Sequence, residues 1–205
     1  MASLISLPHI QRATELERRE SEARWDLSTL KGKLSELSGQ SAAGVSVALR
    51  LIAQTQRGGE PAAWIGSTSR LFYPPDAVGW GIDWEALPII GLGDARQAAR
   101  AADKLLRSGA FGLVVVDLPP RAFVPAPLLG RLMHLAETHR SALLFLTQKP
   151  STEDSLSSLI ALRAQASWAS VDARQLRAQL DIIKDKRRGP GHQHLEDYHG
   201  PLGLH

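Results

Sequence analysis

Residues 32–56 read GKLSELSGQSAAGVSVALRLIAQTQ, and this stretch decides the fold class. Within it, the run from Gly39 to Ser46 matches the phosphate-loop pattern G-x-x-x-x-G-K-[ST], except that Val45 stands where the pattern has lysine. In that motif the glycines let backbone N–H groups surround phosphate oxygens, and the lysine neutralises the β- and γ-phosphates. Because Gly44 and Ser46 are kept, the sequence predicts the shape of a phosphate loop without its charge. We therefore expect no catalytic residues and no cofactor.

Strands and helices alternate after this loop. Lys33–Ser38 has the pattern of a strand that leads into the loop, and residues 45–56 have that of the following helix. Leu113–Asp117 is an almost wholly apolar run that ends in a carboxylate, which is typical of a strand buried on both faces of a parallel sheet. Further strands are predicted at 62–65, 88–91 and 142–147, and helices at 94–108 and 128–140. This alternation predicts an α/β fold with a mostly parallel central sheet and helices on both faces.

The C-terminal part of the chain has a different pattern. Apolar and polar residues alternate in 162–168 and again in 176–182, which predicts a half-exposed antiparallel hairpin added to the sheet. The segment after Arg187 is rich in glycine, proline and histidine, and we expect it to be mobile. The predicted organisation is an N-terminal helical arm (1–29), a core domain with a degenerate phosphate loop (30–190) and a flexible tail (191–205).

The N-terminal segment 9–25 carries charges of both signs around a thin apolar stripe that includes Ile10 and Leu16. This spacing predicts an exposed helix. Two interpretations fit it: a solvated helical arm, and a docking arm whose candidate contact residues are Ile10 and Leu16. Trp80 and Trp84 lie in a predicted loop and are a second candidate for an exposed contact.

Composition excludes several classes of protein. The 205 residues include no cysteine, which excludes disulfides, thiolate metal sites and a cysteine nucleophile. No stretch approaches the roughly 20 apolar residues of a membrane span, and the start lacks the features of a signal peptide, so we expect a cytoplasmic protein. Histidines and two acids gather after residue 191, but their spacing does not match a metal site, and we expect none.

Four segments together resemble one family. Residues 32–56, RSGAFGLVVVDLP (107–119), LLFLTQ (143–148) and IIKDKRRGPG (182–191) occur in the order and at the spacing of the RecA recombinase core. The resemblance covers residues 30–190 and implies a RecA-like core without the recombinase's C-terminal domain. Compact, degenerate RecA-like proteins of this kind occur in the ImuA branch, which is related to the SulA cell-division inhibitors. The sequence is similar to ImuA proteins, which are encoded with ImuB and an error-prone polymerase in bacterial damage-induced mutagenesis.

The resemblance implies a role for each position of the degenerate site. Val45 replaces the lysine that binds phosphate. Ser46 matches the hydroxyl, and Asp117 the carboxylate, that hold Mg²⁺ in the family, although a helix N-cap or first-turn serine is the interpretation of Ser46 that we favour. Thr68 falls where the family has the glutamate that polarises water, and threonine cannot act as a base at neutral pH. Gln148 matches a glutamine that senses the γ-phosphate. The loss of the lysine at Val45 and the loss of the glutamate at Thr68 together imply a protein without ATPase activity.

The family also holds single-stranded DNA with two loops. Here the matching loops, 119–125 and 149–155, offer only Arg121, Phe123 and Lys149 for contacts with DNA. Binding to a nucleic-acid backbone needs several phosphate-neutralising residues and usually stacking aromatic side chains. We therefore expect weak or no direct DNA binding.

Lys184 and Lys186 match a pair that reaches the neighbouring subunit's nucleotide in RecA filaments, and the alternative is an exposed basic strand end. The resemblance and the missing chemistry together predict a non-catalytic protein of the DNA-damage (SOS) response, with RecA and the ImuB–polymerase assembly as partners. Such a protein would modulate recombination and favour translesion synthesis. Two alternatives stay open: a weak ATP-binding ATPase, supported by the remaining glycines and hydroxyl of the loop, and a SulA-like inhibitor that binds the cell-division tubulin homologue.

Overall fold

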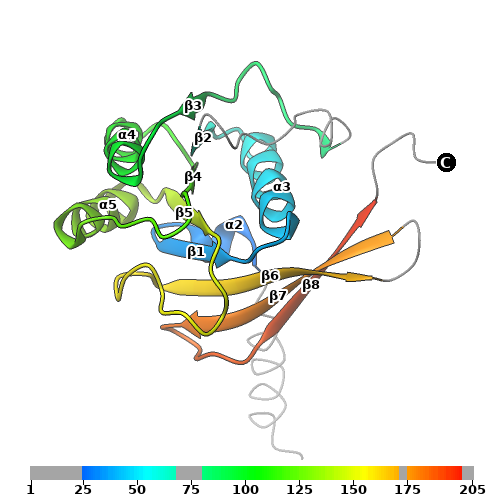
Figure 1. Ribbon diagram of the computed structural model, residues 1–205. Coiled ribbons are helices and arrows are strands. Elements are labelled where there is room, and N and C mark those ends of the chain that lie inside the picture. Colours follow the sequence, from blue (N-terminus) through cyan, green and yellow to red (C-terminus); the bar gives the residue numbers. More distant parts are fainter. Residues whose placement is uncertain (1–24, 68–79, 171–174, 200–205) are drawn as a thin grey trace, which may run out of the picture.

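The computed structural model describes residues 25–67, 80–170 and 175–199, which form one sheet with helices on both of its faces (Figure 1). The helices are α2 (Leu27–Leu30), α3 (Ala43–Arg57), α4 (Ala95–Arg107) and α5 (Ala126–His139). The strands are β1 (Leu34–Ser38), β2 (Ala62–Gly66), β3 (Ile89–Gly91), β4 (Leu113–Asp117), β5 (Ala142–Thr147), β6 (Leu162–Ser170), β7 (Gln175–Asp185) and β8 (Gln193–His199). Within the described ranges, no helix has the length and apolar character needed to cross a membrane.

The strands follow the order β3-β2-β4-β5-β1-β6-β7-β8 across the sheet. The strands β3, β2, β4, β5, β1 and β6 run parallel to one another. Strand β7 is antiparallel to both of its neighbours, β6 and β8. The predicted α/β fold is confirmed, and the predicted hairpin is present as β6 and β7. We expected a flexible tail from residue 191, but Gln193–His199 pairs along β7 as an additional strand.

Two apolar clusters cover the two faces of the sheet. Because successive side chains of a strand point to opposite faces, Leu144 of β5 packs in the cluster beneath α2 and α3, and Phe145 packs in the cluster beneath α4 and α5. Val115 and Val116 of β4 divide in the same way. Figure 1 shows α3 on one side of the strands and the pair α4 and α5 on the other.

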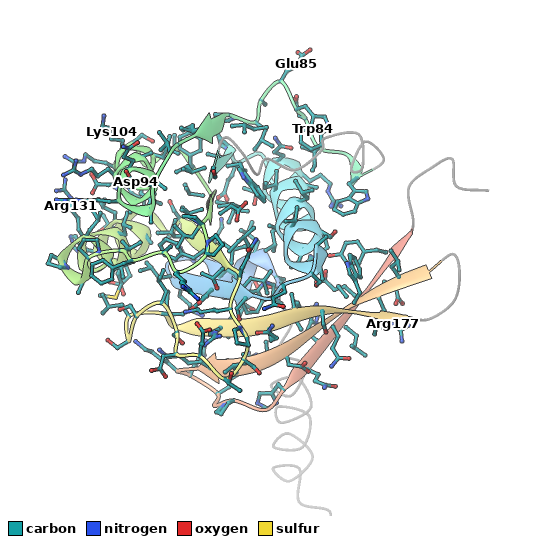
Figure 2. The ribbon with its side chains drawn as sticks, in the orientation of Figure 1. Trp84, Glu85, Asp94, Lys104, Arg131 and Arg177 are labelled. Carbon is teal, nitrogen blue, oxygen red and sulfur yellow. The ribbon has the colours of Figure 1, made fainter. Side chains whose placement is uncertain are left out.

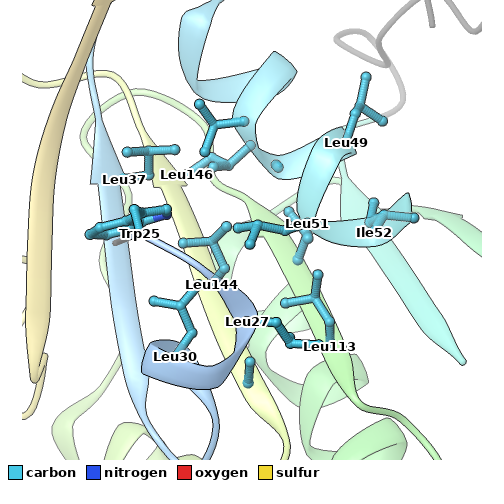
Figure 3. Packing of buried hydrophobic residues seen from close by; sticks show 14 of the residues in the cluster. Trp25, Leu27, Leu30, Leu37, Leu49, Leu51, Ile52, Leu113, Leu144 and Leu146 are labelled. Carbon is cyan, nitrogen blue, oxygen red and sulfur yellow. The ribbon is translucent and has the colours of Figure 1, made fainter. Parts of the chain in front are cut away.

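The core begins earlier in the chain than the sequence suggested. Trp25 is 1% exposed, and Leu27 and Leu30 are buried beside it in the cluster beneath α3 (Figure 3). The carboxylate of Asp26 accepts the N–H of Thr29 at 2.9 Å and so caps α2. We expected this stretch to belong to the arm and its linker, but it is part of the core. The predicted contact residues Ile10 and Leu16 lie outside the described residues.

The tryptophans of the described residues face the core. Trp64 is fully buried in β2, as its strand pattern indicates. Trp80 and Trp84 were a candidate for an exposed contact, but both are half-buried against the cluster beneath α3. The ring centroids of Trp80 and Tyr198 in β8 lie 5.4 Å apart. Those of Trp168 and Tyr198 lie 5.5 Å apart, in an edge-to-face contact. The aromatic side chains therefore help to hold β8 against the rest of the domain.

Candidate functional site

The degenerate phosphate loop joins β1 to α3 at the carboxyl end of the parallel strands. Gly39 has a φ of 149°, and a Cβ at this position would lie 2.4 Å from the carbonyl oxygen of Ala166 in β6. A side chain there would clash with the backbone, so the close approach requires glycine. The N–H of Gly39 also donates to the carbonyl of Thr147 in β5 at 3.1 Å. The loop is thus held between two strands before α3 begins at Ala43.

The residue that replaces the motif's lysine packs inward. Gly44, Val45 and Ser46 all lie in the first turn of α3, and Val45 is half-buried against the apolar cluster beneath that helix. The N–H of Ser46 donates to the carbonyl of Ala42 at 3.1 Å in the ordinary helical pattern, which makes Ser46 a first-turn serine and Ala42 the N-cap. The first turn contains no acidic residue, so the helix N-terminus still favours an anion. The cation of the motif is absent from this turn.

The other positions of the site lie along the same edge of the sheet. Asp117 ends β4, and its Cβ lies 3.5 Å from the place that a Cβ on Gly66 of β2 would take. The structure therefore brings Asp117 beside the end of β2, after which Thr68 follows in the sequence. Thr68 itself lies outside the described residues. Gln148 is half-buried directly after β5, which separates β4 from β1 in the sheet.

A buried polar cluster at this edge escaped the sequence analysis. It comprises Glu36, Ser38, Thr147, Lys149 and Arg163, and we call it the Glu36 cluster. The Glu36 side chain is fully buried, and that of Arg163 is 1% exposed. Glu36 Oε1 accepts a hydrogen bond from Thr147 Oγ1 at 2.9 Å and lies 2.8 Å from Lys149 Nζ. Arg163 Nε lies 4.0 Å from the same oxygen and donates to Ser38 Oγ at 3.2 Å.

The Glu36 cluster fastens the segment that follows β5, residues 149–155, which the resemblance matched to one of two DNA-binding loops. The N–H of Leu156 donates to Glu36 Oε2 at 2.8 Å. The Arg163 guanidinium donates to the carbonyl of Pro150 at 2.9 Å and also to that of Glu153. These backbone groups provide hydrogen bonds to the buried charges of Glu36 and Arg163. The segment is therefore part of the packed interior of the domain.

The three candidate DNA contacts differ in exposure. The Lys149 side chain is 16% exposed and is paired with Glu36. Phe123 is 76% exposed, and Arg121 is exposed in a left-handed turn with a φ of 57°. The sequence placed all three in loops, and the structure leaves two of them accessible to a ligand.

Lys184 and Lys186 also differ from each other. Lys184 is half-buried, and its Nζ lies 3.5 Å and 3.4 Å from the carbonyl oxygens of Ser157 and Ser158. Burial, and then the positive charge of Lys186, hold the pKa of Lys184 below its usual value. Lys186 is exposed at the end of β7. Of the two lysines, Lys186 is the one free to meet another molecule.

A second polar cluster ties β8 to α3. Glu196 Oε1 lies 2.5 Å from Arg50 Nη2 and 2.7 Å from His194 Nε2, and Tyr198 donates its hydroxyl to Glu196 Oε2 at 2.6 Å. Burial alone would raise the pKa of Glu196, but the hydrogen bond from His194 and the charge of Arg50 outweigh it and hold that pKa below its usual value. In the described part of the chain, no group of three or more His, Asp or Glu side chains is arranged to hold a metal ion.

Comparisons with known proteins agree with this geometry. Residues 28–145 match the model of the RecA N-terminal domain. The chain is 38% identical over 97 residues to Protein RecA of Corynebacterium urealyticum, 39% to that of Corynebacterium pseudotuberculosis and 37% to that of a Nocardioides species. These alignments cover 45% of this chain and 26–27% of the relatives, so the chain spans about a quarter of the length of the curated relatives it matches. By the match over more than half of its length, the chain belongs to the RecA N-terminal domain family.

Proposed function

We propose that this chain is a non-catalytic RecA-like protein, similar to ImuA, that binds RecA and restrains homologous recombination during the response to DNA damage. Its further partners in this proposal are ImuB and an error-prone polymerase, whose action it favours. The observation that carries the proposal is the inward packing of Val45 at the position of the motif's lysine. In this proposal the RecA-like fold keeps a surface that RecA can bind, while the lysine that binds the phosphates is lost.

The effect of losing the lysine on the free energy of nucleotide binding can be estimated. A charge-assisted hydrogen bond to phosphate contributes about 1.5–3 kcal/mol, and its absence weakens nucleotide binding roughly 10–150-fold. Asp117 and the N-terminus of α3 remain in position but do not replace this cation. The sequence also offers Thr68 in place of the water-activating carboxylate. Val45 affects nucleotide binding and Thr68 affects the chemical step. The two replacements together support a protein without ATPase activity.

The fastened segment after β5 supports the same proposal from another side. Residues 149–155 hold the buried guanidinium of Arg163 through backbone carbonyls. A loop held in this way supports the proposal of weak or no direct DNA binding. A subunit that can join a RecA filament, but neither binds nucleotide nor holds DNA, ends the filament. Because a filament grows through one repeated head-to-tail contact, such a subunit acts at low stoichiometry.

Strand exchange by RecA tests the proposal. Added at substoichiometric amounts, the purified protein should slow strand exchange, and its own affinity for single-stranded DNA should be too low to explain the effect by competition. It should also show no ATP turnover above a blank, with or without single-stranded DNA. Inhibition only at concentrations that coat the DNA would overturn the capping mechanism. Turnover that follows the protein through a final purification step would overturn its non-catalytic nature.

A weak nucleotide-binding protein is the second candidate, because the first turn of α3 keeps a serine and has no acidic residue. A rise in the thermal unfolding temperature with ATP and Mg²⁺, absent with adenosine, would favour it. Pull-down with RecA and, in parallel, with the cell-division tubulin homologue separates both candidates from a SulA-like inhibitor.

A further inference from the structure

Basic side chains gather on the outer side of α4 and α5. Four of them lie along one face of α4, and one comes from α5; we call them the α4–α5 basic surface: Arg96, Arg100, Lys104, Arg107 and Arg131. Their spacing of four, four and three residues along α4 aligns them in one stripe, and all five are exposed. Figure 2 shows Lys104 and Arg131 together on this side of the molecule.

The surface is hollowed between the two helices. A cavity of about 660 Å³ lies here, lined by Arg100, Asp103, Lys104, Arg107, Leu128 and Arg131. Asp103 lines it and is 8% exposed. Arg107 Nη2 lies 2.7 Å from one of its carboxylate oxygens, and Arg131 Nε lies 2.6 Å from the other. One buried carboxylate thus positions two guanidinium groups from different helices.

The hollow keeps an excess of positive charge. Four basic side chains and one acidic side chain line it, which gives a net charge of +3. Arg100 and Lys104 form no ion pair with any other described residue, so the described fold does not use their charge. Asp103 offsets only one of the four positive charges, and the charges that remain repel one another unless a further anion binds among them. The hollow therefore keeps a net positive charge. The residues on which the proposed function rests do not line it, so that function does not account for this charge.

We propose that the α4–α5 basic surface binds an acidic segment of a partner protein. The Arg100 guanidinium can bind a carboxylate in a bidentate geometry, Lys104 adds a second positive charge, and Leu128 adds an apolar contact inside the hollow. The volume lies within the roughly 300–1,000 Å³ of pockets that enclose small ligands and side chains. The α4 stripe rises over about 16 Å, which an extended peptide of about five residues spans.

Single-stranded nucleic acid fits this surface less well. Proteins that bind it without sequence preference combine a basic groove with aromatic side chains on which the bases stack. No residue that lines the hollow is aromatic. Phe123, the most exposed large apolar side chain of the described residues, belongs to the loop before α5 and does not line it.

Fluorescence anisotropy with a labelled Glu-rich peptide that carries single leucines tests the proposal. Arg100→Glu with Lys104→Glu should weaken peptide binding at least about tenfold, because both side chains face the hollow and neither is paired with Asp103. Arg187→Glu with Arg188→Glu makes the same change of charge on the exposed turn after β7 and should leave binding within about twofold. If the first variant does not fold, as judged by circular dichroism, Arg100→Gln with Lys104→Gln takes its place.

Three outcomes overturn the proposal. Equal losses in the two charge-reversal variants would mean that the peptide responds to net charge and not to this surface. A labelled oligothymidine whose affinity falls more than that of the peptide in Arg100→Glu with Lys104→Glu would make nucleic acid the ligand. Retained peptide affinity in that variant would also exclude this site.

Discussion

Glu36 and Arg163 stand opposite each other in the parallel ladder of β1 and β6, and both side chains are buried. Removing two charges from water is costly, and their attraction offsets this cost only when hydrogen bonds satisfy the remaining polar atoms. Here Thr147, the N–H of Leu156 and two loop carbonyls supply those bonds. The pair therefore acts chiefly by fixing the segment after β5 in one place.

Glu36→Gln should lower the free energy of unfolding by about 3–5 kcal/mol, because it leaves the buried cation of Arg163 without its carboxylate. Urea unfolding followed by circular dichroism measures this change. Arg177→Gln is the control, since it breaks an exposed ion pair with Asp197 on β8 and should leave the unfolding midpoint nearly unchanged. Equal effects of the two substitutions would show that the buried pair matters no more than a surface pair.

Attachment of β8 should depend on pH through Glu196. Its pKa is lowered on folding, so its contribution to stability is fully present above its ordinary pKa of 4.5 and is lost as the pH falls through the lower folded value. Glu196→Gln should therefore be less stable than the natural sequence at neutral pH, and the difference should shrink in acid below pH 4.5. Thermal unfolding at a series of pH values measures it. A difference that stays constant into the acid range contradicts the assignment.

Val45→Lys should strengthen binding of ATP with Mg²⁺ by roughly 10–150-fold, because Gly39, Ser46 and the N-terminus of α3 already form the rest of the loop. Titration calorimetry measures the affinity. Val45→Met supplies a long uncharged side chain at the same position and should not strengthen binding. Neither variant should turn over ATP, since Thr68 offers no base. Turnover by Val45→Lys would place the catalytic carboxylate elsewhere.

Deletion of residues 1–24 should leave a cooperative thermal transition but weaken binding to RecA at least about tenfold, or 1.4 kcal/mol. The cut must stop before Trp25, because that side chain is 1% exposed in the core. Trp25→Ala should instead cost about 3–5 kcal/mol of stability.

The opposite edge is tested by Lys184→Ala with Lys186→Ala, with binding to RecA measured by surface plasmon resonance. If the deletion leaves RecA affinity intact and the double substitution abolishes it, the protein caps the filament from its other end. If both variants bind as the natural sequence does, the filament mimicry is wrong.

Local pattern was enough to predict most of the fold. Apolar runs such as Leu113–Asp117 form the predicted strands, because a strand buried on both faces can hold few other residues. The pattern failed for β8, whose residues are mostly polar. Its place depends on Glu196, which meets Arg50 across a long stretch of sequence, and no window of neighbouring residues contains that contact.

The candidate site shows the same division. The motif located Gly39 and Val45, since their spacing is local. It did not locate the Glu36 cluster, because a single carboxylate in an otherwise apolar strand has no meaning until its partner is known. The sequence contains one clue: Arg163 interrupts the start of another strand with the opposite charge. Pairing the two required the register of β1 and β6.

The fastening of residues 149–155 has a consequence for recognition. A loop that becomes ordered only upon binding lowers the affinity, because its conformational entropy is lost. Only the molecules that already have the binding-competent conformation can bind. Here the buried guanidinium of Arg163 has already selected one arrangement. A protein that docks on this edge meets a preformed loop, so its affinity depends on how well its surface complements that loop.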